Sequence, residues 1–419
     1  MDKLLVRGQN KLSGTVMISG AKNAAVAVIP AAIMAEDICV IDNLPYIEDV
    51  KCLNITLNKM GVICSYKDKH TLKIDSSNLK NVSVTFDEVR RMRASYYLLG
   101  ALLARFKRAE VAMPGGCNFG TRPIDLHLKG FRALGAKVEI DGEIVRVYAD
   151  KLVGANIYMD TVSVGATINI MLAATMAEGT TEIENAAKEP HIVDVANFLN
   201  MMGAKIKGAG TDVIRITGVE NLHGAEYTII PDQIEAGTYM IAAAITHGKV
   251  IVKNIIPKHM DSLSAKLIEI GVNINEGDDY IEVDSTNSKL KSTSIKTMAY
   301  PGFPTDLQPQ IAALLSICEG TSMITENIWD KRYQYTDELK RFGAKINVEG
   351  RIAIIEGISE LSGADVEATD LRAGAAMILA ALAARGETTI SAVKYIDRGY
   401  EEVEHKFSQL GADIKRVSV

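Results

Sequence analysis

The sequence predicts an α/β protein of two domains, each built from three copies of one βαβαββ unit, with helices inside and sheets outside. Six similar helix-to-strand junctions recur at a nearly constant spacing, and several Ala-rich segments are apolar on almost every helical face. A chain of 419 residues is also long for one hydrophobic core. Six units shared between two domains make three units each.

The junctions have the form of an apolar helical pattern, a glycine and a short strand, as in RALGAKVEI and LKRFGAKIN. Each glycine suits the position just after a helix, where a left-handed backbone ends it. Successive glycines are 74, 68, 68, 72 and 68 residues apart. The six glycines are Gly61, Gly135, Gly203, Gly271, Gly343 and Gly411.

A second landmark recurs in phase with the first, because a buried Ala-rich helix is followed each time by a short β-branched strand. AGTYMIAAAIT and LRAGAAMILAALAA are helices of this kind. A strand pair closes the unit, and GAKVEIDGEIVRVYA indicates a hairpin that turns at Asp141-Gly142. The six strands end at Asn43, Pro114, Asn185, Asn254, Asn327 and Ala392.

Composition excludes several classes of protein. The net charge of −6 and the absence of a long polybasic block argue against a nucleic-acid partner. The start of the chain does not resemble a signal peptide, and its longest apolar run is too short to insert in a membrane. Five cysteines without metal-type spacing suggest reduced thiols in the cytoplasm, and no metal or cofactor is expected.

The residues that open the buried helices are unusual. Counted back from the second landmarks, they lie 21, 21, 22, 19, 21 and 20 positions upstream, so repeat symmetry places them on one face of each domain. Helix N-termini attract anions, and two such faces turned toward one cleft would form a positive pocket in an acidic protein. The residues are Lys22, Arg93, Ser163, Glu235, Asp306 and Arg372.

An alternative is that these residues are ordinary helix caps. That interpretation suits Ser163 and can be extended to Asp306. It does not suit Lys22, Arg93 or Arg372, because a cation at a helix N-terminus opposes the helix dipole. A functional role therefore explains the three cations better.

Cys117 differs from the other four cysteines, because it lies in the polar loop PGGCNFG rather than in an apolar run. It is either a harmless surface thiol or a reactive thiol on a hinged loop, which Arg122 would stabilise as a thiolate. The strip that follows, GTRPIDLHLKGF, can be a helix start capped by Asp125 or a polar platform for a ligand. Arg398, in DRGYEE, follows its landmark strand as the cysteine loop does, which favours an anion clamp over a plain surface turn.

With these residues in place, the whole chain resembles the enolpyruvyl transferases. The motifs that carry the resemblance run in order along the chain: SGAKNAA, PGGCNFGTRPIDLH, SVGAT, ENAAKEPHIVD, FPTDLQ and DRGYEE. The resemblance implies a two-domain inside-out α/β barrel. It also implies that residues 1–21 join 231–419 in one domain, that 22–230 form the other, and that the active site lies in the cleft between them.

The resemblance further implies transfer of the enolpyruvyl group of phosphoenolpyruvate to the 3-hydroxyl of UDP-N-acetylglucosamine, with release of phosphate, as the first committed step of peptidoglycan precursor synthesis. Cys117 would be the general acid and Asp306 the base. Lys22, Arg122 and Arg398 would hold the phosphate and carboxylate while charge develops. A monomer that closes on its small-molecule substrates is expected.

The nucleotide sugar would be bound by side chains and backbone from both domains. Asn23 would contact the sugar, and Ile328 would meet it through its backbone. Arg372 would take part in closure or phosphate binding. The uridine and diphosphate would rest on Arg93, on Arg122, Pro123, Ile124, Asp125 and Leu126, and on Ser163, Val164 and Gly165.

Two positions depart from the family pattern. Thr161 stands where some relatives have a lysine before SVGAT, so one diphosphate contact is missing or supplied elsewhere. Asp330-Lys331-Arg332-Tyr333 replaces an acid-Asn-Arg-Phe sequence. Neither change is expected to touch the chemistry.

Two other functions compete with this one. The related enzyme that acts on shikimate phosphate shares the repeats, but Cys117 and the strip after it argue against that substrate. A catalytically idle relative would bind UDP-sugar alone. Retention of Lys22, Cys117, Asp306 and Arg398 weighs against it, because a pure binder needs neither an acid nor a base.

Overall fold

The chain forms two compact units in this computed structural model, which describes residues 2–87, 89, 92–113 and 124–418. The first unit comprises residues 1–19 and 231–419, and the second comprises residues 20–230. Each unit has its own hydrophobic core, and the two cores share no residue. Two independent cores explain why a chain of this length does not fold as one domain.

The second unit, residues 20–230, contains three repeats and the strand that completes the first of them. Its helices and strands follow the order helix, strand, helix and strand pair. They are α1 (Lys22–Ala32), β3 (Ile38–Asp42), α2 (Glu48–Lys59), β4 (Ile63–Tyr66), β5 (Leu72–Asp75), β6 (Ser83–Val84), η1 (Arg93–Tyr96), α4 (Tyr97–Phe106), β7 (Arg108–Ala112), α5 (Asp125–Ala133), β8 (Lys137–Asp141), β9 (Ile144–Tyr148), β10 (Asn156–Tyr158), α6 (Val164–Ala174), β11 (Thr180–Glu184), α7 (Pro190–Met201), β12 (Lys205–Lys207), β13 (Val213–Thr217) and β14 (Glu226–Thr228).

The first unit begins with two strands from the start of the chain and continues after residue 230. Its order of elements matches that of the second unit. They are β1 (Asp2–Arg7), β2 (Ser13–Met17), α8 (Gln233–Ile245), β15 (Lys249–Lys253), η2 (Pro257–Met260), α9 (Asp261–Ile270), β16 (Asn273–Glu276), β17 (Tyr280–Asp284), β18 (Ser294–Lys296), η3 (Thr305–Leu307), α10 (Gln308–Leu315), β19 (Thr321–Thr325), α11 (Tyr335–Arg341), β20 (Lys345–Glu349), β21 (Ile352–Glu356), β22 (Asp365–Glu367), α12 (Leu371–Ala383), β23 (Glu387–Ser391), η4 (Val393–Tyr395), α13 (Val403–Gln409) and β24 (Asp413–Ser418).

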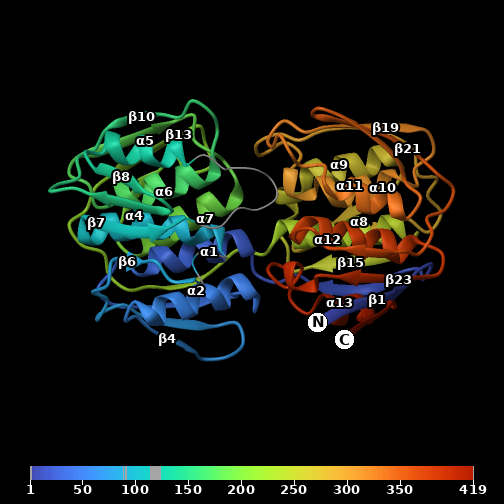
Figure 1. Ribbon diagram of the computed structural model, residues 1–419, viewed down its shortest axis with the longest axis horizontal. Helices are drawn as coiled ribbons and strands as arrows, with labels where there is room; N and C mark the ends of the chain where they lie inside the picture. Colours follow the sequence, from blue (N-terminus) through green and yellow to red (C-terminus); the bar gives the residue numbers. More distant parts are fainter. Residues whose placement is uncertain (1, 88, 90–91, 114–123, 419) are drawn as a thin grey trace. The chain divides into compact units, whose positions relative to one another are not determined.

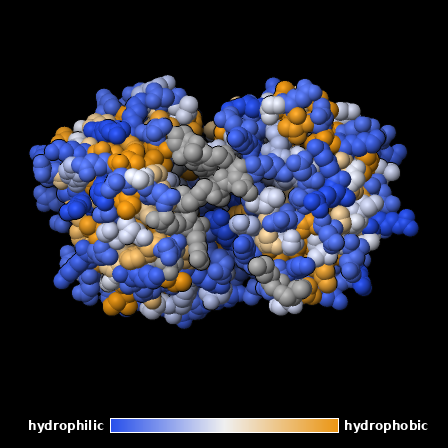
Figure 2. All heavy atoms as spheres, viewed as in Figure 1, coloured by the Kyte–Doolittle hydropathy of each residue, from blue (hydrophilic) through white to orange (hydrophobic). Residues whose placement is uncertain are grey.

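Every repeat forms one four-stranded sheet, which confirms the predicted six-fold repetition. In each sheet one strand pairs in parallel with its neighbour, as β10 does with β11, and the remaining pairs are antiparallel. Strands such as β21 alternate exposed and buried residues, so one face meets water. Figure 2 shows hydrophilic residues spread over the visible surface of each unit, with hydrophobic residues among them.

The Ala-rich helices are buried inside the units, as their apolar patterns predict. Every residue of α10 is buried, as are nearly all residues of α8 and α12. In Figure 1 the strands lie toward the outside of each unit, and α6 and α10 are among the helices they enclose. The α/β architecture, with central helices and outer sheets, is therefore as predicted.

The repeat landmarks have clear physical roles. All six junction glycines have positive φ, from 92° at Gly343 to 109° at Gly271, as expected after a helix end. Four of the landmark asparagines donate a side-chain hydrogen bond to the backbone beside the parallel strand. They are Asn43, Asn185, Asn254 and Asn327. Each asparagine therefore ties the end of the central strand to its parallel neighbour.

The predicted hairpin turn at Asp141-Gly142 is displaced by one residue. Asp141 still pairs with Ile144 in the ladder, so Gly142 and Glu143 form the turn. Gly142 supplies the positive φ of 58° that the turn requires.

Strands from distant parts of the chain complete two sheets of the first unit and one of the second. β1 pairs with both β23 and β24, and β2 pairs with β15. β14 pairs in parallel with β3 and thereby closes the first repeat of the second unit. The second unit is thus inserted in sequence between β2 and α8.

Candidate active site

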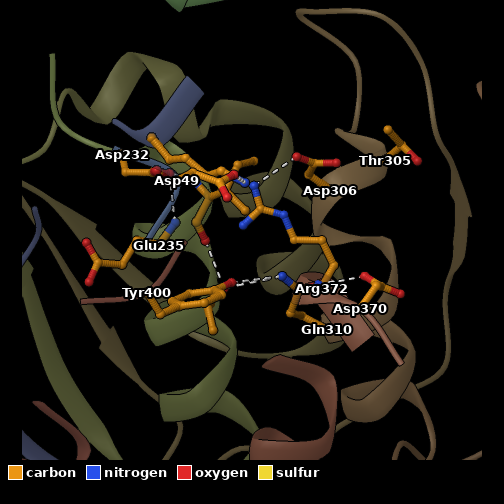
Figure 3. Close-up of polar contacts among 12 residues, drawn as sticks. Asp49, Asp232, Glu235, Thr305, Asp306, Gln310, Asp370, Arg372 and Tyr400 are labelled. Atoms are coloured by element: carbon orange, nitrogen blue, oxygen red, sulfur yellow. Dashed lines mark hydrogen bonds and ion pairs between the residues drawn. The ribbon is translucent and has the colours of Figure 1, made fainter. Parts of the chain in front are cut away.

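In the first unit, two of the predicted helix-start residues meet through their side chains. Asp306 lies in η3, which leads into α10, and Arg372 lies in the first turn of α12. Arg372 Nη2 is 2.9 Å from Asp306 Oδ2. Figure 3 shows this pair pointing toward each other from two separate helices.

A second arginine completes the contacts to this carboxylate. Arg332 Nη2 is 3.4 Å from Asp306 Oδ1 and 3.2 Å from the carbonyl oxygen of Thr305. The two arginine side chains are 4% and 6% exposed, whereas Asp306 is 32% exposed. The carboxylate therefore sits at the accessible edge of a buried cationic pair.

These contacts decide between the two interpretations of Asp306. Asp306 does not cap its helix, because its side chain pairs with the arginines instead; Asp370 caps α12, and Asp232 caps α8. Within residues 330–333, the residue that contacts Asp306 is Arg332, which the family pattern shares. Sequence reasoning did not identify Arg332 as a site residue.

Arg372 also packs against the ring of Tyr400. The guanidinium carbon lies 6.0 Å from the centre of the Tyr400 ring. The Tyr400 hydroxyl is 2.8 Å from Thr238 Oγ1 and accepts a 3.3 Å hydrogen bond from Gln310 Nε2. Burial lowers the pKa of Arg372, but the adjacent Asp306 carboxylate more than offsets this effect and leaves the pKa above its usual range. Arg372 is therefore a fixed, permanent cation.

The other predicted residues of this unit lie in loops after landmark strands. Arg398 lies half-buried in the turn that follows η4. The N–H of Ile328 donates a 2.8 Å hydrogen bond to Oε1 of the buried Glu326. This N–H is therefore already hydrogen-bonded within the protein, and the Ile328 carbonyl is the backbone group left for a further contact of the kind predicted.

Glu235, which shares the helix-start position, has a different environment. Its side chain is 3% exposed, pairs with Lys406 Nζ at 2.6 Å and accepts the N–H of Ser19 at 2.8 Å. Burial raises the pKa of Glu235, and Lys406 opposes that change. This residue ties the start of the chain to α8.

In the second unit, α1 begins with Lys22 and Asn23. Lys22 Nζ is 3.0 Å from Asp49 Oδ2, and the two side chains are 13% and 8% exposed. Asp49 belongs to the first turn of α2 and was not identified from the sequence. The carboxylate gives the cation a defined position at the helix start.

The SVGAT segment forms the start of α6. Ser163 is its N-cap and accepts a hydrogen bond from Ala166 N, which confirms the cap interpretation for this residue. Val164 and Gly165 form the first turn, and all three are partly exposed. Thr161 is exposed, but Lys129 lies nearby and pairs with Asp160 at 2.6 Å. A lysine is therefore present beside the place where some relatives have one.

Part of the predicted strip is described and part is not. Ile124 precedes α5 as its N-cap residue, while Asp125 is the first helical residue and makes no capping hydrogen bond. Of the two alternatives for this strip, the one in which Asp125 is the N-cap is therefore excluded. Leu126 is partly buried. Arg93 is the first residue of η1, and Cys117, Arg122 and Pro123 lie outside the described residues.

Burial distinguishes three described cysteines from a reactive thiol. It raises the pKa of Cys39 to about 11 and the pKa values of Cys64 and Cys318 to about 12. These thiols remain protonated at neutral pH, so they are poor nucleophiles.

The described residues form neither a metal site nor a membrane-spanning helix. Within residues 2–87, 89, 92–113 and 124–418, no group of His, Cys, Asp and Glu side chains has a metal-binding arrangement. No helix in those segments has the length and apolarity that a membrane crossing requires.

The geometry gives each unit its own chemical character. The first unit presents a carboxylate held between two arginines, and the second presents Lys22 and the N-terminus of α6. A positioned carboxylate can accept a proton, and fixed cations and helix N-termini bind phosphate and carboxylate groups. Each unit, taken by itself, therefore presents groups that suit an anionic substrate.

Comparison with known proteins gives consistent results along the whole chain. A model of the EPSP synthase (3-phosphoshikimate 1-carboxyvinyltransferase) family matches residues 6–407. UDP-N-acetylglucosamine 1-carboxyvinyltransferase 2 of Clostridium acetobutylicum is 59% identical over 421 residues, covering 100% of both chains. UDP-N-acetylglucosamine 1-carboxyvinyltransferase of Clostridium botulinum is 58% identical over 418 residues, again with 100% of both chains covered.

Solved structures agree in fold. The enolpyruvyl transferase NikO from Streptomyces tendae superposes with a TM-score of 0.91 at 27% identity, covering 100% of this chain and 99% of that one. EPSP synthase from Acinetobacter baumannii gives a TM-score of 0.74 at 20% identity, with 100% of both chains covered. At that identity the second likeness concerns the fold alone.

Proposed function

Because this chain belongs to the EPSP synthase family, we propose that it is a UDP-N-acetylglucosamine 1-carboxyvinyltransferase. It transfers the enolpyruvyl group of phosphoenolpyruvate to the 3-hydroxyl of UDP-N-acetylglucosamine and releases phosphate. The observation that carries this assignment is 59% identity over the full length of a relative with that name. The reaction opens peptidoglycan precursor synthesis, and we place it in the cytoplasm.

The reaction has an addition step and an elimination step. In the addition, the sugar oxygen forms a bond to the central carbon of phosphoenolpyruvate, the hydroxyl loses its proton, and the methylene carbon gains one. In the elimination, the resulting methyl group loses a proton and the carbon–oxygen bond to phosphate breaks. The products are the enolpyruvyl ether and phosphate, so atoms and charge balance without a cofactor.

We assign the proton transfers to two residues. Cys117 delivers the proton to the methylene carbon, and Asp306 accepts the proton of the sugar hydroxyl. The partly exposed carboxylate of Asp306 supports this role, because Arg332 and Arg372 hold it in a defined position. The role assigned to Cys117 is based on its sequence motif alone.

The phosphate and carboxylate of phosphoenolpyruvate are assigned to Lys22, Arg122 and Arg398. Lys22 is positioned by Asp49, which supports its use as an anion ligand at a helix start. Asn23 and the carbonyl of Ile328 are assigned to the sugar. The uridine diphosphate is assigned to Arg93, to residues 122–126 and to residues 163–165, with Arg372 acting in closure or phosphate binding.

This assignment draws the acid from one unit and the base from the other. We therefore propose that both units contribute to one active site, and that the nucleotide sugar binds first and phosphoenolpyruvate second. Small-angle scattering should then show compaction of the monomer when the nucleotide sugar is added. An unchanged radius of gyration at saturating ligand would contradict this proposal.

Phosphate release tests the function directly. Purified protein with phosphoenolpyruvate should release phosphate when UDP-N-acetylglucosamine is added and not when shikimate 3-phosphate is added. The Cys117→Ala variant should lose this activity. Release with shikimate 3-phosphate would favour the related enzyme, and UDP-sugar binding without release would favour an idle relative.

A further inference from the structure

A polar group is buried where α4, α5 and α6 of the second unit meet. Asn169 on α6 is fully buried, and His127 on α5 is 8% exposed. The rest of α6 is almost entirely apolar, with buried residues along its length. A buried amide is costly unless its donors and acceptor are all paired, so the partners of Asn169 define its purpose.

The hydrogen bonds of Asn169 fix the orientation of its amide. Its Oδ1 accepts the backbone N–H of Gly100 at 2.8 Å, and its Nδ2 donates to the Tyr96 carbonyl at 2.7 Å. The opposite orientation would place a donor against a donor and an acceptor against an acceptor. The second hydrogen of Nδ2 is then directed at His127 Nδ1, 2.9 Å away.

This contact determines the protonation of the imidazole. Nδ1 of His127 faces a donor, so it must be the acceptor nitrogen. A neutral imidazole then carries its hydrogen on Nε2, and an imidazolium would oppose two N–H groups. Burial also lowers the pKa of His127 to about 4, in agreement with a neutral ring.

Two glycines make this arrangement possible. A Cβ on Gly100 would lie 2.3 Å from Asn169 Oδ1, which no side chain could tolerate. A Cβ on Gly165 would lie 3.1 Å from both Cε1 and Nε2 of His127. The edge of the ring that carries the N–H therefore lies against the first turn of α6, which belongs to the SVGAT segment.

We propose that Asn169 is a positioning residue that holds His127 as the Nε2–H tautomer, so that this N–H donates a hydrogen bond to the diphosphate of the nucleotide sugar at the start of α6. The identity of the ligand in this inference rests on the proposed function. The tautomer rests on the three hydrogen bonds of Asn169 and is independent of it.

Nitrogen-15 spectroscopy of the histidine rings tests the tautomer. Long-range proton–nitrogen correlation spectra at pH 7 distinguish a protonated Nε2 from a protonated Nδ1. The chain has seven histidines, and the signal that disappears in His127→Gln identifies residue 127. We expect a neutral ring with Nε2–H in the unaltered protein, and a mixed or shifted pattern in Asn169→Ala.

Binding of UDP-N-acetylglucosamine and of UDP, measured by calorimetry, tests the role. Asn169→Ala and His127→Asn should weaken both ligands about tenfold or more, because a hydrogen bond to a charged group is lost. Glutamine can place an N–H near the Nε2 position, whereas asparagine reaches only the Nδ1 position. The His127→Gln variant should therefore bind both ligands with dissociation constants within about threefold of those of the unaltered protein. Thr175→Val, at the opposite end of α6, is the matched control and should bind as the unaltered protein does.

The outcomes separate the two proposals. An Nδ1–H ring in the unaltered protein, or Asn169→Ala with an unchanged spectrum and unchanged affinity, would overturn this inference. If the unaltered protein binds neither ligand, the proposed function fails, and the spectrum still decides the tautomer. Equal loss in His127→Gln and His127→Asn would reject Nε2–H as the donor.

Discussion

Arg372 Nη2 and Asp306 Oδ2 are 2.9 Å apart, although 66 positions separate the two residues in the chain. The contact joins the starts of two buried helices from neighbouring repeats. Together with Arg332 it leaves the carboxylate as the accessible member of an otherwise buried group.

This relationship predicts separate effects on turnover and binding. Asp306→Asn keeps the shape and one acceptor but cannot take up a proton. We expect phosphate release to fall at least about a hundredfold while the dissociation constant of UDP-N-acetylglucosamine changes less than about threefold. Near-normal turnover of Asp306→Asn, measured with phosphoenolpyruvate in excess, would remove Asp306 as the base.

Tyr400 and Tyr239 offer a matched pair of buried tyrosines. The Tyr400 hydroxyl bonds Thr238 and Gln310, whereas the buried Tyr239 hydroxyl has no partner among the described residues. Tyr400→Phe should lower the free energy of unfolding by about 1–2 kcal/mol, and Tyr239→Phe should leave it unchanged or raise it. Urea unfolding midpoints of the two variants provide the measurement, and the reverse ranking would contradict the hydrogen-bond assignments.

Because Glu235 and Lys406 form a buried pair, substitutions at the two residues should have strongly coupled effects on the free energy of unfolding. Lys406→Met leaves the Glu235 carboxylate buried without its cation, so we expect a loss of about 3–5 kcal/mol in unfolding free energy. Adding Glu235→Gln should recover part of that loss. A double-mutant cycle from denaturant unfolding measures the coupling, and strictly additive effects would exclude it.

His127 predicts a pH dependence of stability. Its pKa in the folded protein is about 4, below the ordinary value of 6.5, so the unfolded chain binds the proton more tightly. The contribution is fully present above pH 6.5 and is lost as the pH falls toward 4. This loss should lower the free energy of unfolding by about 2 kcal/mol at pH 5 relative to pH 7.5.

The comparison with His127→Gln isolates this contribution, because glutamine does not titrate. The difference in urea midpoint between the two proteins should change between pH 7.5 and pH 5 in the stated direction. Parallel pH profiles would show that His127 does not titrate below its ordinary value.

Cys117 predicts selective alkylation. An epoxide that enters the phosphoenolpyruvate site should inactivate the enzyme by reaction at Cys117, because Cys39, Cys64 and Cys318 remain protonated. Cys117→Asp should retain turnover and resist the reagent. Mass spectrometry of the treated protein locates the adduct, and full sensitivity of Cys117→Asp would refute the assignment.

The repeat architecture could be predicted because it depends on local rules. A residue such as Gly343 is required wherever a helix ends in a left-handed conformation, so its spacing reports the unit directly. Helix burial was similarly visible from Ala-rich segments with no polar face. The hairpin at Gly142 was displaced by one residue because register depends on pairing between strands rather than on turn composition alone.

The partners of the site residues could not be predicted in the same way. Asp49 and Arg332 reach Lys22 and Asp306 from other elements, and such pairing depends on tertiary structure. A signal was nevertheless present, because Asp49, Arg332 and Arg398 follow their landmark residues by six, five and six positions. The cap alternative for Asp125 fails because the helix begins one residue too early for that role, although aspartate is a residue type that suits a cap.

The interleaving of distant strands has a consequence for synthesis of the chain on the ribosome. The second unit is complete once residue 230 has emerged, and it can fold while translation continues. β1 must wait for β23 and β24, the last strands made. At ordinary elongation rates the remaining 189 residues (419 − 230) take roughly 10–40 s. During that interval β2 can pair with β15, but β1 remains an extended segment without its partner strands.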